Sequence, residues 1–327
     1  MTRSRVARRS TALAAPAAVL FVLLCGFEVP AAQVAAPAAP SAAAPHTVAY
    51  GAPMLAAIQA LTAPGMDGRA AGTSGGAKAR AWIESRLRTI GARPLTGEAY
   101  GQTFALTTST GETVKATNLL AVCPGTRADG RVIVVSAHYD HLGVRNGQTY
   151  HGADDNASGV AMLLTVAERC VTTPFAHTLV LAAFDAEERG LQGAKAFLAA
   201  PPIPVDRIDL SVNFDMVSRS ERREIYAAGP GRWPRLLPVL TAAVREAPIA
   251  VKFGHDTGGG QDDWTQQSDH GVFHAAGIPF VYFGVEDHAD YHKPTDTADK
   301  IDPAFLDGVA AVVLSSLTAL DRAPAVK

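Results

Sequence analysis

From residue 130 onward, short continuous apolar runs alternate with longer segments in which apolar residues recur every three or four positions. The run RVIVVSAH at 131–138 is rich in β-branched residues, which is typical of a strand buried on both faces. SGVAMLLTVAERC at 158–170 has the spacing of a helix, with Ser158 as a candidate N-cap. The other predicted strands are 177–185, 208–216, 222–229 and 277–284, and the other predicted helices are 189–200, 233–247 and 303–321. This alternation predicts an α/β fold with a mixed, mostly parallel central sheet and helices on both faces.

The segment before residue 130 has a different pattern. Residues 74–90 have helical spacing, and Gly91 supplies a stop. Two strand-like runs follow at 102–108 and 114–122, separated by the turn residues STGE. These two runs predict a β-hairpin.

The N-terminus has the pattern of a targeting segment. Several arginines within the first nine residues precede the apolar run ALAAPAAVLFVLLCGF. We expect a signal peptide over 1–31, an Ala/Pro-rich linker over 32–49 and one domain over 50–327. The alternative is a membrane anchor, but the run is short for a span and no basic residues follow it. We therefore expect cleavage, no stable membrane span afterwards, and export to the periplasm or the extracellular space.

Composition and charge narrow the class of protein. The 327 residues are 48% hydrophobic and 18% charged, and the formal net charge is -2, so nothing favours disorder or a nucleic-acid partner. Cys25 lies in the predicted signal peptide, which leaves Cys123 and Cys170. In an exported protein these two cysteines either pair or remain two buried thiols, and the sequence leaves both possibilities open.

Polar clusters follow the predicted strands at their carboxyl ends. They occupy residues 138–141, 154–156, 185–188, 215 and 286–292. Ligands of open α/β sheets bind beyond these strand ends, so we expect the clusters to share one rim. Each cluster alone has an ordinary explanation as a turn, a helix start or a capped loop. Together the carboxylates need a counter-cation, and histidine with carboxylate, without cysteine, suits zinc or a similar divalent ion.

The spacing within the clusters suggests how such ions would be held. On an extended segment, residues two apart face the same side, so Asp140 can reach one ring nitrogen of His138 while the other binds metal. Glu187 and Glu188 are adjacent and point differently, so one can bind metal while the other faces a water. A carboxylate can bridge two ions about 3.5–4 Å apart, and Asp155 in its small-residue loop fits that task.

Several ordered motifs are similar to a known family. They read SAHYDH, GADDNASG, FDAEERG, NFDM and YHKPTDT, accompanied by GRAAGTSGGAKARAWI and SDHGVFHAAGIPF. The chain resembles the secreted bacterial two-zinc aminopeptidases of peptidase clan MH, of the leucine aminopeptidase and aminopeptidase Y type. The resemblance covers about residues 66–301. It implies a zinc exopeptidase fold of the phosphorylase/hydrolase-like kind, with 50–327 as the catalytic domain.

The resemblance also implies two Zn²⁺ ions per chain and a set of ligands. His138 and Glu188 would bind one zinc, and Asp215 and His292 would bind the other. Asp155 would bridge the two ions.

Three further residues receive catalytic roles from the resemblance. Glu187 would be the general base that activates a water shared by the two zinc ions, and Asp140 would orient His138. Tyr291 would steady the tetrahedral intermediate. The implied reaction removes the N-terminal residue from peptide substrates with a free N-terminus.

Other residues near these motifs receive no direct role on the metals. Asp154 is expected to be a loop residue beside the bridge, and Asp269 and His270 to line the substrate end of the site. The histidines left without a metal-binding role are His141, His151, His255 and His288.

Two alternative functions stay open on the same fold. One is a single-zinc acyltransferase of the glutaminyl cyclase type, and the other is a non-catalytic binding module. A serine hydrolase is disfavoured because no predicted strand leads into a Gly-x-Ser-x-Gly turn, which is the context of a nucleophile elbow. The sequence does not indicate the preferred N-terminal residue or the oligomeric state.

Overall fold

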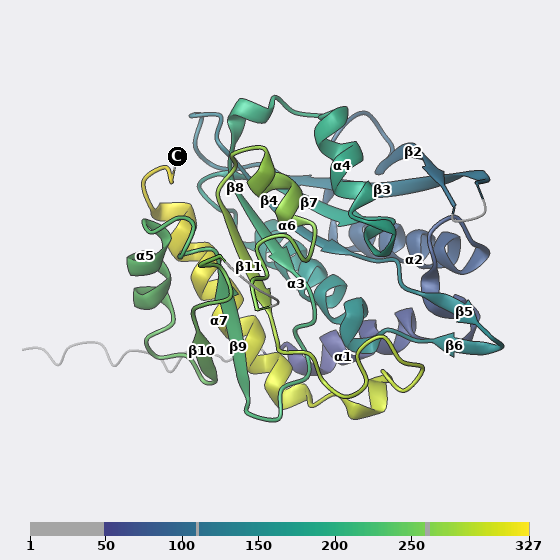
Figure 1. The fold of residues 1–327 in the computed structure, drawn as a ribbon. Coiled ribbons are helices and arrows are strands. Elements are labelled where there is room, and N and C mark those ends of the chain that lie inside the picture. The colour runs from purple at the N-terminus through teal and green to yellow at the C-terminus, as the bar shows by residue number, and fades with distance from the viewer. Residues whose placement is uncertain (1–48, 109–110, 259–261, 327) are drawn as a thin grey trace, which may run out of the picture. The chain divides into compact units, whose positions relative to one another are not determined.

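The computed structural model describes residues 49–108, 111–258 and 262–326 (Figure 1). The predicted signal peptide and all but the last residue of the predicted linker lie outside these ranges. Apart from residue 49, the described residues therefore belong to the predicted domain over 50–327.

A mixed sheet forms the centre of the described domain. Its strand order is β1-β3-β7-β4-β8-β11-β9-β10, with β2 paired to β3. The bounds are β1 Arg93–Pro94, β2 Gly101–Thr107, β3 Thr113–Cys123, β4 Val132–His138, β7 Thr178–Phe184, β8 Ile208–Phe214, β9 Glu224–Ala228, β10 Ala250–Lys252 and β11 Phe280–Gly284. The four central strands β7, β4, β8 and β11 are parallel to one another, and antiparallel pairs join β7 to β3 and β11 to β9. The predicted fold class is confirmed.

The central strands are buried on both faces, as their continuous apolar runs predict. Every residue of β4 is buried, and alternate side chains of the sheet enter two different clusters. Val135 packs with the helices of one face, and Val134 with those of the other. A parallel strand between two helical layers has no solvent face, which removes any need for polar alternation.

Helices cover both faces of the sheet (Figure 1). On one face lie α1 (Gly51–Leu61), α2 (Ser74–Ile90), α3 (Gly159–Thr172), α5 (Leu236–Ala243) and α7 (Pro303–Arg322). On the other lie α4 (Gln192–Ala199) and α6 (His270–Ala275). Within the described ranges, α7 is the helix long and apolar enough to cross a membrane. Its apolar residues pack in the large core cluster, as expected for a core helix of this length.

Local predictions were mostly confirmed, with two corrections. The predicted hairpin is the pair β2 and β3, and α2 ends at Gly91 with a left-handed backbone (φ 88°). The helix predicted over 233–247 is shorter, since α5 covers only Leu236–Ala243. Ser158 makes no N-cap bond, because its own backbone is already helical (φ -65°, ψ -46°), and its hydroxyl instead donates to the Asp154 carbonyl at 2.7 Å.

Two smaller features complete the frame of the site. A hairpin of β5 (Gly143–Arg145) and β6 (Gln148–Tyr150) was not predicted from the sequence. Cys123 at the end of β3 and Cys170 in α3 form a disulfide, with their Cα atoms 6.1 Å apart. The disulfide therefore joins the sheet to the helix that follows the Asp154-Asp155 segment.

Candidate metal centre

The parallel register brings the polar clusters to one edge of the sheet. His138 on β4 pairs with Phe184 on β7, so Asp185 and the turn Glu187–Arg189 follow at the same level. On the other side of β4, Ser136 pairs with Asn213 of β8, which puts Asp215 level with His138. This common edge confirms the expected arrangement of the strand ends.

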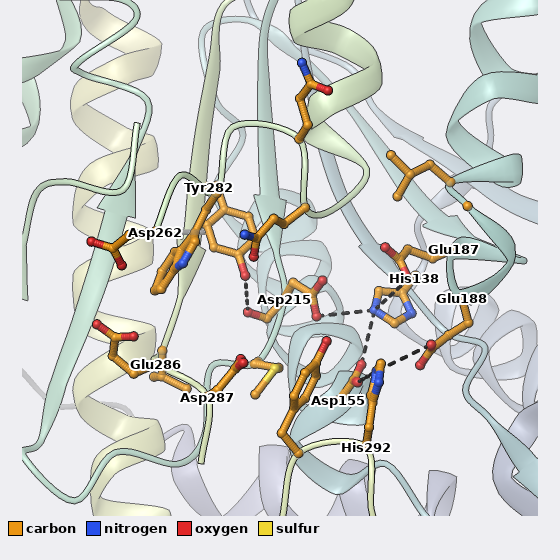
Figure 2. A pocket seen from close by; sticks show the side chains of 18 of the residues that line it. His138, Asp155, Glu187, Glu188, Asp215, Asp262, Tyr282, Glu286, Asp287 and His292 are labelled. Carbon is orange, nitrogen blue, oxygen red and sulfur yellow. Dashed lines mark hydrogen bonds and ion pairs between the residues drawn. The ribbon is translucent and has the colours of Figure 1, made fainter. Parts of the chain in front are cut away.

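One group of three donors forms around His138. Its Nε2 lies 3.3 Å from Oδ1 of Asp215 and 3.4 Å from Oδ1 of Asp155 (Figure 2). Two donors bound at about 2.0–2.1 Å to one tetrahedral zinc lie about 3.3 Å apart. His138, Asp155 and Asp215 are therefore spaced as ligands of one ion.

A second group shares Asp155 with the first. Nε2 of His292 lies 3.0 Å from Oδ2 of Asp155 and 3.5 Å from Oε2 of Glu188. The two oxygens of Asp155 thus face different histidines, Oδ1 toward His138 and Oδ2 toward His292 (Figure 2). This is the geometry of a carboxylate that bridges two sites.

The grouping corrects the expected pairing of the ligands. Glu188 was expected to share an ion with His138, and Asp215 with His292. Instead Asp215 lies beside His138, and Glu188 lies beside His292. The reason is the strand order: β8 is the neighbour of β4, so Asp215 stands next to His138, whereas Glu188 sits one turn beyond β7 and faces the loop that carries His292.

The electrostatics of the site indicate a demand for positive charge. Burial opposes protonation of His138, yet Asp215 and Glu187 outweigh it and hold the pKa of His138 well above its ordinary value. Burial likewise opposes protonation of His292, but Asp155 and Glu188 raise its pKa to about 10. For Glu188, burial is outweighed by contacts with His141 and His292, which lower its pKa to about 2. Each imidazole takes up positive charge that a metal ion would supply.

The residues predicted to act in catalysis lie around the same group. Burial and then the nearby Asp215 raise the pKa of Glu187 well above its usual range, and Oε2 of Glu187 lies 4.0 Å from Nε2 of His138. Nδ1 of His138 lies 3.2 Å from the Asp140 carbonyl and 3.6 Å from its carboxylate. That carboxylate also accepts a hydrogen bond from the backbone N–H of Glu187 at 3.0 Å, so Asp140 contacts both residues. The Tyr291 ring stacks on His292 with centroids 4.0 Å apart.

A cleft of about 760 Å³ opens from the metal-ligand groups (Figure 2). Its lining also includes the carboxylates of Asp262, Glu286 and Asp287, together with Trp264, and Figure 2 shows Asp262 and Glu286 on the side away from His138. His255 was expected to bind no metal, and it contacts Asp262 at 3.0 Å and Glu286 at 3.2 Å. The cleft therefore has a metal-ligand end and an acidic wall.

The expected position of Asp269 and His270 was wrong. Both side chains are fully buried and neither lines the cleft. His270 packs on Phe280 and Tyr282, and burial raises the pKa of Asp269 to about 8. They lie at the start of α6, where the Asp269 carboxylate is close enough to His138 and Asp215 to feel their charges.

Arg69 is a site residue that the sequence analysis missed. Its side chain is fully buried, and it donates to the carbonyls of Tyr139 (2.9 Å), His151 (2.6 Å) and Gly152 (2.9 Å). It also reaches the carbonyls of Leu61 at 3.1 Å and Asp155 at 3.5 Å. One guanidinium thus joins the end of α1, the segment after β4 and the loop of the bridging aspartate. No local periodicity marks such a residue; the only signal was its place in the motif GRAAGT.

Two more carboxylates hold the loop of Asp155. Asp296, from the motif YHKPTDT, accepts hydrogen bonds from the backbone N–H groups of Asp154 and Asp155 at 3.0–3.1 Å. Asp154 accepts from the N–H and hydroxyl of Ser218, both at 2.7 Å, and lies 3.1 Å from His288. Asp154 is therefore a loop-fixing residue, as expected.

Residues 118–317 match the sequence model of peptidase family M28, and this span contains both groups of donors. The chain belongs to this family. Curated relatives include the aminopeptidase YwaD of Bacillus subtilis, which is 28% identical over 57% of this chain and 40% of its own length. The probable lipoprotein aminopeptidase LpqL of Mycobacterium tuberculosis is 29% identical over 76% of this chain and 54% of its own length. The chain thus spans about half of the length of these curated relatives.

Solved structures share the fold. An aminopeptidase from Aneurinibacillus sp. strain AM-1 has a TM-score of 0.65 at 19% identity, covering 82% of this chain and 93% of that chain. A glutaminyl cyclase from Porphyromonas gingivalis also has a TM-score of 0.65 at 19% identity, covering 82% of this chain and 97% of that chain. At this identity the likeness establishes the fold, and both chemistries occur on it.

Replacing the Arg69 guanidinium should destabilise both the site and the fold. Arg69→Met leaves buried carbonyls without donors, and we expect the free energy of unfolding to fall by at least about 3 kcal/mol. Urea denaturation measures this change. Arg245→Met, at an exposed position, is the matched control and should stay within about 0.5 kcal/mol of the unchanged protein. Equal stability of both variants would contradict the clamping role of Arg69.

Proposed function

We propose that this protein is a zinc-dependent aminopeptidase that uses two metal ions. The observation that carries the proposal is the position of Asp155, whose two oxygens face His138 and His292 separately. A carboxylate shared in this way is the central feature of two-metal hydrolytic sites. Family membership supports peptide-bond hydrolysis, and relatives with aminopeptidase names support action at the N-terminus.

The donor set fits zinc. It combines two imidazoles with three carboxylates, without cysteine, and the donor atoms have the spacing of shared ligands. His138, Asp155 and Asp215 would hold one ion, and Asp155, Glu188 and His292 the other. A relative from Pyricularia oryzae, 38% identical over 39% of this chain and 26% of its own length, carries the name "Probable zinc metalloprotease", which supports the same metal.

Bound zinc supplies a water of lowered pKa and polarises the carbonyl that is attacked. Glu187 is placed to take a proton from that water, because its carboxylate borders the His138 group and lines the cleft. The same carboxyl group can then return the proton to the leaving amine. Tyr291 lines the cleft beside His292, where its hydroxyl can donate to the developing oxyanion.

The substrate class is a peptide with a free N-terminus. An α-ammonium group needs anionic partners, and the acidic wall of Asp262, Glu286 and Asp287 lines the same cleft as the metal ligands. Such a wall disfavours a blocked or acidic N-terminus. It offers no features for nucleic acid, whose phosphates it would repel.

We further propose that the protein is exported, to the periplasm or the extracellular space. The arginine-rich and apolar N-terminus supports this, and so does the disulfide between Cys123 and Cys170, because such bonds persist in oxidising compartments. Cleavage after the predicted signal peptide would leave no membrane span at the N-terminus.

Protein recovered from the periplasm or the medium should begin after residue 31 and should resist thiol alkylation until it is reduced. Intact mass and peptide mapping measure both properties. Protein that stays in the cytoplasm with two free thiols would contradict the proposal of export.

Replacing the proposed base should separate catalysis from metal binding. Glu187→Gln keeps the size of the side chain but cannot accept the proton, so we expect kcat on an aminoacyl p-nitroanilide to fall about 10²–10⁴-fold. The zinc content should stay at that of the unchanged protein. Asp155→Asn is the matched comparison, and it should lose metal because the bridge is weakened. A Glu187→Gln enzyme that hydrolyses at the unchanged rate would remove Glu187 from the mechanism.

The metal count and the choice of substrate discriminate between the two chemistries of this fold. We expect two zinc ions per chain by elemental analysis, and loss of aminopeptidase activity with a chelator. A peptide with N-terminal glutamine should release its first residue rather than ammonia. One zinc per chain together with ammonia release would favour the cyclase, and activity that survives full metal removal would contradict both.

A further inference from the structure

His141 lies within the second group of metal donors, although its sequence motif suggested no such role. Its side chain is fully buried, and Nδ1 lies 2.7 Å from Oε1 of Glu188 and 3.7 Å from Oδ2 of Asp155. Its ring centroid is 5.9 Å from that of His292. Two histidines thus flank the same two carboxylates.

The distances indicate that His141 has a different task from the proposed ligands His138 and His292. The nitrogens of His138 and His292 lie 3.0–3.5 Å from their carboxylate oxygens, close to the spacing of about 3.3 Å for two ligands on one zinc. The 2.7 Å contact of His141 is shorter than that spacing and has the length of a charge-assisted hydrogen bond. Its second contact, at 3.7 Å, is too long for a hydrogen bond.

Each oxygen of Glu188 therefore faces a different histidine. Oε2 faces His292, on the side where a metal would bind, and Oε1 faces His141. In the present arrangement the ring is not aligned with Oε1, and among the described residues neither ring nitrogen of His141 has a hydrogen-bond partner. Ring rotation about the terminal torsion is soft, so a small turn would align Nδ1–H with Oε1.

Gly152 provides the space for this ring. A Cβ atom at Gly152 would lie 2.5 Å from Cδ2 of His141, and the backbone there is left-handed (φ 58°). The same glycine offers its carbonyl to Arg69. The loop of Asp155 is thus shaped to keep the His141 ring beside Glu188.

We propose that His141 is a positioning residue of the second metal site: it donates from Nδ1–H to Oε1 of Glu188 and so directs Oε2 to the metal. This inference rests on the two-metal site of the proposed function. Hydrogen bonds to metal-binding carboxylates fix their orientation, and their loss typically weakens metal affinity 10–100-fold.

The experiment measures the affinity of each zinc equivalent by competition with a chelating dye. Its variants are His141→Asn, whose amide N–H can replace Nδ1–H, and His141→Phe, which keeps the ring without a donor. We expect His141→Phe to bind one of its two zinc equivalents about 10–100-fold more weakly, and His141→Asn to stay within about threefold of the unchanged protein. The control His274→Phe replaces a histidine on α6 whose Nδ1 also lacks a described partner, and it should bind zinc normally.

The outcomes separate the possible failures. Unchanged affinities in His141→Phe would overturn the role of His141 while leaving the two-metal site in place. Equal weakening in His141→Asn and His141→Phe would also overturn it, because the donor would then not be the relevant feature. If His141→Phe does not fold, as judged by circular dichroism, His141→Leu takes its place in the comparison. An unchanged protein that binds fewer than two zinc ions would overturn the proposed function itself.

Discussion

Charge balance at the carboxyl edge of the sheet is the constraint on which the rest of this structure depends. Asp155, Glu188 and Asp215 are gathered there with two imidazoles between them. Buried carboxylates of like sign raise the cost of one another's ionisation unless a cation lies among them. The raised pKa values of His138 and His292 express that demand in protons, and a pair of divalent ions would meet it with larger charges.

Contacts to the backbone of Asp155 keep this arrangement. They leave the side-chain oxygens of Asp155 available. Arg69 lies within reach of the Asp155 carbonyl, and Asp296 accepts a hydrogen bond from the Asp155 N–H, so both residues hold the backbone of Asp155. Burial lowers the pKa of Arg69 to about 10, while the nearby Asp155 and Asp296 favour its charged form. A guanidinium that remains charged can therefore organise the loop and offset part of its negative charge without occupying the metal positions.

The sequence predicted the parts of the structure that depend on local pattern and strand order. The β-branched run of β4 predicted a strand buried on both faces, and the ends of parallel strands predicted a shared rim. The pairing of Glu188 with His292 was not predictable, because it depends on how a turn after β7 faces a loop more than a hundred residues later. Apart from its place in the motif GRAAGT, Arg69 had no sequence signal, since its partners are carbonyl groups, which every residue possesses. Ser158 had the identity of a cap but not the extended backbone of one, because its own φ and ψ are already helical.

The two halves of the site differ in how firmly the fold holds them. His138 and Asp215 stand at the ends of adjacent strands, and the His138 side chain is only 1% exposed. His292 lies in a loop with a left-handed backbone (φ 53°), and its side chain is 39% exposed. A ligand carried by such a loop can move away from its partners more easily than one fixed by a ladder of strand hydrogen bonds. Support from the framework therefore reaches the second half through Glu188, whose side chain is only 8% exposed. His141, three residues after the last residue of β4, contacts it from the strand side of the site. The order of the motif SAHYDH thus lets one strand end serve both halves: its first histidine belongs to one group of donors, and its second contacts the carboxylate of the other.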